Sequence, residues 1–174
     1  MERQLAHQAR YDSLTQIPNR GLFHDCLDQA LFRAKSSGSP LALLYMDLDS
    51  FKEINDTLGH AAGDIVLRHA VERLVMVVRE EDTVARMGGD EFTVIMTGFS
   101  GREDVVATVE RIFSTLSGPL MAGGQEVSVT ASVGVAVFPE DGEEGGTGSS
   151  ETPTSLCTSP RNDGGMSWSS FVPN

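Results

Sequence analysis

One heptapeptide decides the fold of this chain: Arg86-Met87-Gly88-Gly89-Asp90-Glu91-Phe92. Apolar runs with strand propensity flank it, residues 83–85 on one side and residues 92–96 on the other. A Gly-Gly pair between two such runs predicts a tight β-hairpin, because only glycine adopts positive φ without steric cost. The side chains of Asp90 and Glu91 are expected on opposite faces of the second strand. Taken alone, the pattern fits both a solvated acidic corner and a functional site.

The composition limits the classes of partner. A chain of 174 residues is long enough for one domain with a sizeable core. The net charge of −12 argues against nucleic acid or an anionic membrane surface as partner, and it favours a divalent cation if phosphates are bound. Cys26 and Cys157 form no disulfide framework, and Cys26 is expected to fill core space. Since neither a membrane span nor a signal peptide is recognisable, we expect a soluble, cytoplasmic protein.

The first half of the chain alternates between helix and strand patterns. Residues 1–10 are helix-prone and predict a connecting helix, and a turn segment broken by proline follows. Apolar residues at helical spacing predict a helix over residues 23–34, which ends at residues 36–38. The apolar run 41–46 predicts a central strand buried on both faces. Asp49, just beyond it, is expected to be simply the first solvated position.

The second half continues the pattern until its character changes. A short helix is expected over residues 50–56, a loop over 57–60, and helices over 62–78 and 105–116. Alternating apolar residues from 127 to 137 predict a strand with one buried face. Residues 142–174 are rich in glycine, serine and threonine with almost no apolar periodicity, so this tail is expected to be disordered or poorly packed.

Six motifs in order make residues 11–141 resemble a GGDEF domain, the catalytic domain of diguanylate cyclases. They are Asp12-x-Leu14-Thr15-x-x-Pro18-Asn19-Arg20, Asp47-x-Asp49-x-Phe51-Lys52-x-Ile54-Asn55-Asp56, Gly59-His60-x-x-Gly63-Asp64, Arg79-x-x-Asp82, Arg86-x-Gly88-Gly89-Asp90-Glu91-Phe92 and Ala131-Ser132-x-Gly134-Val135-Ala136. The resemblance implies a single α/β domain. Its central, mostly antiparallel mixed sheet is flanked by helices, as in nucleotide cyclases and polymerase palms.

The resemblance also implies a reaction. Such domains condense two GTP molecules into cyclic di-GMP and two pyrophosphates, with two GTP-loaded copies meeting face to face as a homodimer. Asp47, Asp90 and the carbonyl of Leu48 are the implied ligands of Mg²⁺ or Mn²⁺, because these ions prefer hard oxygen donors. Asp90 is also implied to take the proton from the attacking hydroxyl.

The other implied site residues contact the nucleotide. Asn55 and Asp64 resemble the guanine readers of the family, and Lys52 the residue that stabilises the transition state. Substrate contacts are implied for four further residues: His60, Gly88, Gly89 and Glu91. Outside the motif set, ordinary helix capping would explain Asn55 and Asp64, and a loop position would explain His60.

Arg79 and Asp82 match the inhibitory site of the family, where cyclic di-GMP binds and stops the enzyme. Outside the family, this pair would be a surface ion pair of little energetic value.

The tail departs from the family pattern. The family continues with a helix that carries Asn-Ala-Asp and Tyr-x-Ala-Lys elements, then an Arg-Asn and a last strand. Neither of the two helix elements appears after residue 141, and the Arg161-Asn162 pair found there follows no helical pattern. A shifted reading frame from about residue 148 can encode LLRNADLAMYLAKERRRNVVVFVRS, so we hypothesise a frameshift. The sequence thus leaves three interpretations: a cyclase with impaired activity, a non-catalytic module that binds cyclic di-GMP or GTP, and a destabilised fragment.

Overall fold

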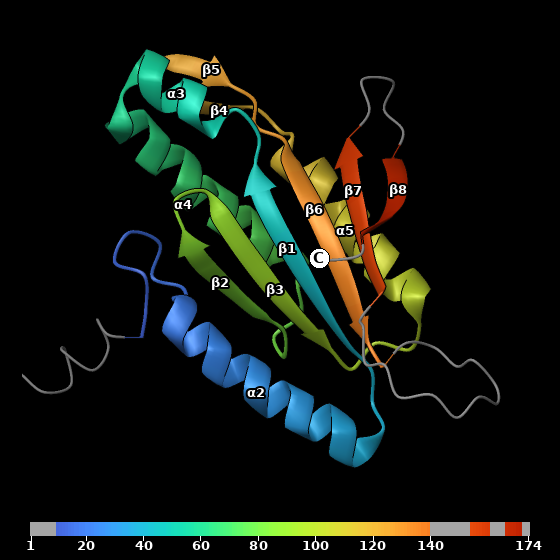
Figure 1. Ribbon diagram of the computed structural model, residues 1–174. Helices are drawn as coiled ribbons and strands as arrows, with labels where there is room; N and C mark the ends of the chain where they lie inside the picture. Colours follow the sequence, from blue (N-terminus) through green and yellow to red (C-terminus); the bar gives the residue numbers. More distant parts are fainter. Residues whose placement is uncertain (1–9, 140–153, 161–165, 172–174) are drawn as a thin grey trace, which may run out of the picture.

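The computed structural model describes residues 10–139, 154–160 and 166–171 and contains a six-stranded sheet (Figure 1). The strand order is β2-β3-β1-β6-β7-β8, and every neighbouring pair is antiparallel. The strands are β1 (Leu41–Leu48), β2 (Thr83–Gly88), β3 (Glu91–Thr97), β6 (Ala131–Phe138), β7 (Thr154–Pro160) and β8 (Met166–Phe171). The predicted α/β fold with a mainly antiparallel sheet is confirmed, and so is the hairpin formed by β2 and β3.

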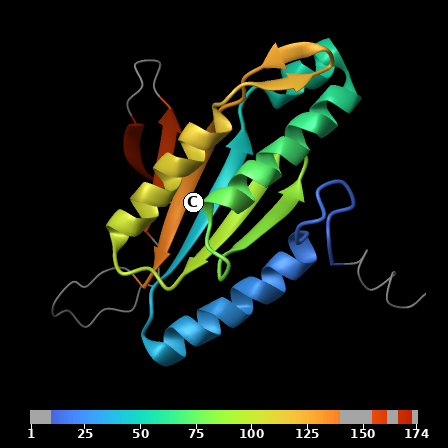
Figure 2. The ribbon, with the colours of Figure 1, turned by 180° about the vertical axis from the view of Figure 1, so that it is seen from behind.

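Helices cover both faces of the sheet, but unequally. Helices α4 (His60–Val77) and α5 (Arg102–Leu116) lie side by side over one face, which Figure 2 shows from behind. Alternate residues of β3, such as Phe92 and Val94, join them in the main core. Helix α2 (Arg20–Ser37) packs on the opposite face, where Ile95 belongs to a smaller core. The predicted helices are confirmed in kind, with ends that shift by a few residues.

Strand β1 is less buried than the sequence predicts. Its first half is buried or half-buried, but Tyr45 is 42% exposed and Asp47 is also exposed. Helix α2 contacts the strand only weakly and packs mainly against β2, so it leaves the end of β1 uncovered on that face. The prediction of a strand buried on both faces is therefore wrong at the end that carries the acidic motif.

The predicted loop over residues 57–60 is absent. Helix α3 (Phe51–Leu58) extends to the residue before Gly59, and α4 starts at the residue after it. Gly59 has φ 89°, a conformation that favours glycine, and its N–H donates to the carbonyl of Asn55 at 2.9 Å. One residue thus joins the two helices.

The predicted strand over residues 127–137 is two strands. A separate hairpin of β4 (Leu120–Ala122) and β5 (Gln125–Val127) turns at Gly123 and Gly124, and β6 starts only at Ala131. Residues 128–130 belong to neither strand, and the hydroxyl of Ser128 donates to the carbonyl of Ser117 at 3.0 Å. From Ala131 onward the predicted alternation of burial is observed.

Two stretches of the tail, residues 154–160 and 166–171, are strands and so differ from the expected disorder, while the rest of the tail lies outside the described residues. Strand β7 pairs with β6, and β8 pairs with β7. Without β7, the side of β6 that faces away from β1 would expose unpaired backbone groups, and these groups can pair with an added strand. The predicted connecting helix lies outside the described residues. Cys26 is half-buried beside the smaller core, as expected for a filler. No helix in the described part of the chain is long and apolar enough to span a membrane.

Candidate active site

Four of the predicted site residues meet at one edge of the sheet. Because β1 and β3 are antiparallel, the end of β1 lies beside the start of β3, and Asp47 is directly opposite Glu91. The N–H of Leu48 donates to the carbonyl of Asp90 at 3.2 Å. We call Asp47, Leu48, Asp90 and Glu91 the acidic edge.

The acidic edge concentrates negative charge. Although the residue is exposed, partial desolvation of its carboxylate raises the pKa of Asp47, and the charge and hydrogen bond of Asp90 raise it further, followed by the charges of Glu91 and Asp49. A cation bound between these carboxylates would relieve their repulsion. Among the described residues, no three His, Cys, Asp or Glu side chains are grouped to hold a metal. The predicted set is different, with two carboxylates and one main-chain carbonyl, and it fits an ion that keeps water and phosphate ligands.

The turn beside the acidic edge is open and built on glycine. Gly88 has φ 146° and Gly89 has φ 50°, and a Cβ added to either would meet no atom within 4 Å. These glycines are therefore needed for backbone conformation, and the turn stays bare on its outer side. The register of the hairpin shifts between Arg86 and Gly88, as in a β-bulge.

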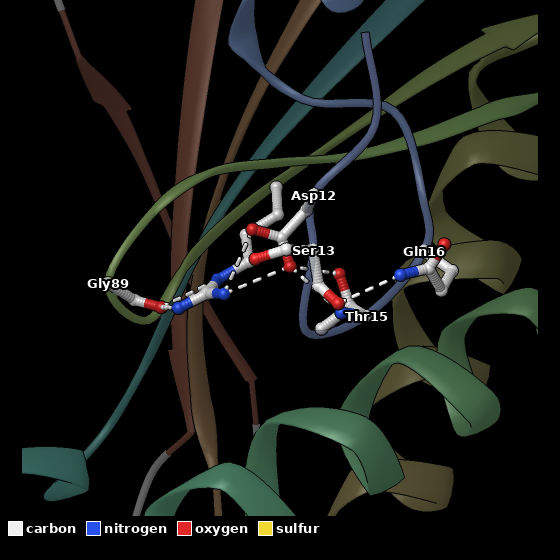
Figure 3. A network of polar contacts seen from close by, with 6 residues as sticks. Asp12, Ser13, Thr15, Gln16 and Gly89 are labelled. Atoms are coloured by element: carbon white, nitrogen blue, oxygen red, sulfur yellow. Dashed lines mark hydrogen bonds and ion pairs between the residues drawn. The ribbon is translucent and has the colours of Figure 1, made fainter. Parts of the chain in front are cut away.

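A half-buried ion pair fastens this turn to the N-terminal segment (Figure 3). The guanidinium of Arg86 donates twice to the carbonyl of Gly89, at 2.7 and 3.0 Å, and twice to the carboxylate of Asp12, at 3.0 and 3.1 Å. The side chains of Arg86 and Asp12 are only 14% and 21% exposed. The N–H of Arg86 also donates to the carbonyl of Pro18.

Asp12 is held as a carboxylate by this network. Burial alone would raise the pKa of Asp12, but hydrogen bonds from the hydroxyl and N–H of Thr15 and from Arg86 outweigh burial and lower it. Sequence reasoning found Asp12 and Arg86 in separate motifs but missed their pairing. They lie 74 positions apart, so the only available signal was their opposite charge.

The remaining predicted nucleotide contacts lie on α3 and α4. Two residues separate β1 from α3, so this helix pair starts at the same end of the sheet as the acidic edge (Figure 1). Lys52, His60 and Asp64 are exposed, whereas Asn55 is half-buried. The carboxamide of Asn55 lies against Gly63.

Asp49 has a role that the sequence did not indicate. Its carboxylate accepts hydrogen bonds from the hydroxyls of Thr130 at 2.7 Å and Ser132 at 2.8 Å. Its N–H donates to the carbonyl of Thr130 at 2.9 Å. These bonds fasten the turn between β1 and α3 to the start of β6. The turn contains Ser50 at φ 59°, an uncommon conformation for a residue other than glycine.

Arg79 and Asp82 lie at the other end of β2. Asp82 accepts from the N–H groups of Arg79 at 3.0 Å and Thr97 at 3.1 Å, so it is anchored. Arg79 lines an open depression of about 550 Å³ whose other lining residues belong to α5, including Arg111. Gly88 follows Asp82 by six positions along the strand, which corresponds to about 20 Å. The structure thus separates this pair from the acidic edge and adds Arg111, which sequence reasoning missed.

Comparison with known proteins identifies the family. The profile described as "Diguanylate cyclase, GGDEF domain" matches residues 9–153. Diguanylate cyclase TpbB of Pseudomonas aeruginosa is 44% identical over 137 residues, which are 78% of this chain and 32% of that protein. Diguanylate cyclase DosC of Escherichia coli K12 is 37% identical over 134 residues, 76% of this chain and 29% of that protein. The chain spans about a third of the length of these curated relatives.

Solved structures agree with the sequence comparison. The GGDEF domain of TpbB (YfiN) from Pseudomonas aeruginosa superimposes with a TM-score of 0.73 at 42% identity, covering 75% of this chain and 77% of that one. The coiled coil and GGDEF domain of DgcB from Caulobacter crescentus, solved in complex with c-di-GMP, has a TM-score of 0.72 at 32% identity, covering 78% and 73%. The fold and the acidic edge thus define a cyclase-like α/β domain. More particularly, the chain belongs to the GGDEF family, which implies a requirement for a divalent metal ion.

Proposed function

We propose that the chain is a diguanylate cyclase domain that condenses two GTP molecules into cyclic di-GMP and releases two pyrophosphates. The observation that carries the proposal is the acidic edge, where Asp47, Leu48 and Asp90 meet beside the bare glycine turn in a chain of this family. In each of two condensations, a 3′-oxygen forms a bond to an α-phosphorus and the bond from that phosphorus to pyrophosphate breaks. The proton of the 3′-hydroxyl passes to Asp90.

Mg²⁺, or Mn²⁺ in its place, is the proposed cofactor. Asp47, Asp90 and the carbonyl of Leu48 would hold it. When bound, the ion supplies charge neutralisation of the triphosphate and acidifies the attacking hydroxyl.

The protein groups around this position bind and orient the nucleotide. Lys52 contributes positive charge near the phosphates, where charge builds up in the transition state. Asp64 accepts hydrogen bonds from the guanine, and Asn55 donates to it. Adenine would leave these polar groups unpaired, which makes it a poor substitute. His60 and Glu91 contact the substrate, and the turn at Gly88 and Gly89 lets the nucleotide approach the backbone.

The reaction needs two copies of the chain. Each copy supplies one GTP, and the two acidic edges face each other so that each hydroxyl reaches the phosphate of the other nucleotide. Arg79 and Asp82 are proposed to bind the product as an inhibitor, together with Arg111, which lines the same depression as Arg79. Arginine suits this role because its planar fork matches phosphate and guanine edges.

The tail is expected to lower activity. The tail contains no lysine, and its Arg161 does not follow the helical pattern that precedes the corresponding arginine in the family. Restoring the hypothesised frame from about residue 148 should therefore raise the rate. Sequencing the gene through this region tests the frameshift hypothesis. The hypothesis is wrong if no base change restores the reading frame of the family.

The deciding experiment is product formation at high protein concentration with GTP and Mg²⁺. Cyclic di-GMP is detected by chromatography, and the expected result is product that disappears in Asp90→Ala but persists in Asp28→Ala, a matched change at an exposed acid of α2. A folded chain that makes no product would overturn the proposed cyclase activity. Saturable cyclic di-GMP binding that is lost in Arg79→Ala would then identify a binding module, and the absence of both would indicate a damaged fragment.

A further inference from the structure

Gly63 is a glycine that the backbone does not require. It lies in the first turns of α4, is buried, and has no positive φ. Alanine is a better helix former than glycine at such a position, so glycine lowers the stability of the helix. What glycine adds here is space.

The side chain of Asn55 fills that space. A Cβ placed on Gly63 would overlap Oδ1 of Asn55, would lie 2.9 Å from its Cγ, and would lie 3.3 Å from the ring of Phe51. The main chain of Asn55 is held independently by the hydrogen bond from Gly59 and by the packing of α3 on α4. An added methyl group would therefore displace the carboxamide and leave the helix in place.

We infer that Gly63 is a specificity-determining residue that acts through Asn55. By leaving out a side chain, it lets the carboxamide of Asn55 occupy the position from which it donates to guanine. This inference rests on the proposed function, because it takes Asn55 as a base-reading residue. It adds that the selectivity for guanine depends on the missing side chain at Gly63 in the neighbouring helix.

A double-mutant cycle tests the inference. Binding of GTP and of ATP is measured by calorimetry with Mg²⁺ on the full chain, for the wild type, Gly63→Ala, Asn55→Ala and the double variant. We expect Gly63→Ala to weaken GTP binding about tenfold and to lower the ratio of GTP to ATP affinity. We expect the double variant to match Asn55→Ala, because the methyl group has nothing left to displace. Gly21→Ala is the matched control, since its Cβ would make only an ordinary contact at 3.4 Å.

The possible results separate this inference from the proposed function. Wild-type affinity and selectivity in Gly63→Ala would overturn the inference alone, as would losses that simply add in the double variant. A wild type that binds neither nucleotide would overturn the proposed function and this inference with it. If Gly63→Ala unfolds more easily than the wild type, removing Asn55 should restore its unfolding midpoint. A double variant that stays equally unstable would contradict the inference without any nucleotide.

Discussion

The proposed nucleotide site has two sides that are built by different means. The hairpin side, made of the acidic edge and the turn at residues 86–91, is held by charge. Arg86 ties its turn to Asp12, and the carboxylates of the acidic edge repel one another. The helix side, made of α3 and the start of α4, depends on close packing. Gly59 connects the two helices, and Gly63 leaves room for the side chain of Asn55.

This difference predicts which kind of substitution should affect each side of the site. Electrostatic interactions change with pH and with the loss of a charge, whereas close packing changes with the addition or removal of volume. Substitutions that remove a charged side chain should therefore act most strongly on the hairpin side. Variants that add a methyl group should act on the helix side.

The largest effect is expected from Asp47→Asn. Losing a carboxylate at the proposed metal position should lower the rate of cyclic di-GMP formation by about 100-fold or more. The same change should leave the free energy of unfolding without metal unchanged or higher at neutral pH. Burial and neighbouring charges raise the pKa of Asp47, so the folded state favours its protonated form and loses that stabilisation as pH rises through the folded pKa.

Rate and stability of Asp47→Asn must be measured on the same protein. Chromatographic product assays give the rate, and denaturant unfolding in chelator gives the stability. Asp28→Asn, on the exposed face of α2, controls for the lost charge. A metal-free Asp47→Asn that is clearly less stable than the wild type would show that the acidic edge is not under repulsion.

Arg86→Ala is expected to have the next largest effect. It removes both donors to the carbonyl of Gly89 and leaves the half-buried Asp12 without its cation. We expect a loss of about 2–3 kcal/mol in stability and a rate at least about tenfold lower, because the turn loses its fixed position. Arg86→Lys should recover only part, since lysine lacks the planar fork.

The control for Arg86 is Arg10→Ala. Arg10 pairs with Asp25 at 2.9 Å, but these side chains are 54% and 60% exposed, so the loss should stay below about 1 kcal/mol. Denaturant unfolding and product assays on both variants make the comparison. Equal effects of the two substitutions would remove the distinction between the hairpin network and an ordinary surface pair.

Asp49→Ala is expected to act through metal binding. Without its carboxylate, the hydroxyls of Thr130 and Ser132 no longer fix the turn that follows Leu48. The concentration of Mg²⁺ needed for half-maximal rate should rise about tenfold, with a smaller change at saturating Mg²⁺. Titrating Mg²⁺ in the product assay measures both quantities. Ser128→Ala, which removes another hydroxyl nearby, should change neither, and an equal rate loss at every Mg²⁺ concentration would point to a different role.

Much of the fold followed from local sequence patterns. The apolar spacing of α4 and α5, the hairpin around Gly88 and Gly89, and the alternation along β6 were predictable because each is set by residues close in the chain. The separate β4–β5 hairpin was missed because its strands have three residues each, too few for a periodic signal. The exposure of Tyr45 depended on where α2 crosses the sheet, which no local pattern contains.

The site was predictable in its residue types but not in its supports. Motifs named Asp47 and Asp90, and strand pairing then explains why they meet. The supporting contacts join positions far apart, such as Asp12 with Arg86 and Asp49 with Ser132, so local spacing could not reveal them. The room at Gly63 exists because this residue has no side chain. A sequence shows that a glycine is present there but not which side chain uses the room.

The smallest expected effect is on the acid dependence of the free energy of unfolding that arises from Asp12. This dependence should involve the hairpin side and not the helix side. Hydrogen bonds from Thr15 and Arg86 lower the folded pKa of Asp12 below its usual value of 3.8. Its stabilisation is therefore complete above that value and is lost as pH falls through the folded pKa. Denaturant unfolding between about pH 5 and pH 2 should show a shallower decline for Asp12→Asn than for the wild type, with Asp25→Asn as the control for one lost charge. Gly63→Ala should run parallel to the wild type over the same range, because added volume does not titrate. A wild-type slope in Asp12→Asn would mean that the ion pair contributes nothing to acid stability, and a changed slope in Gly63→Ala would mean that the helix side also depends on charge.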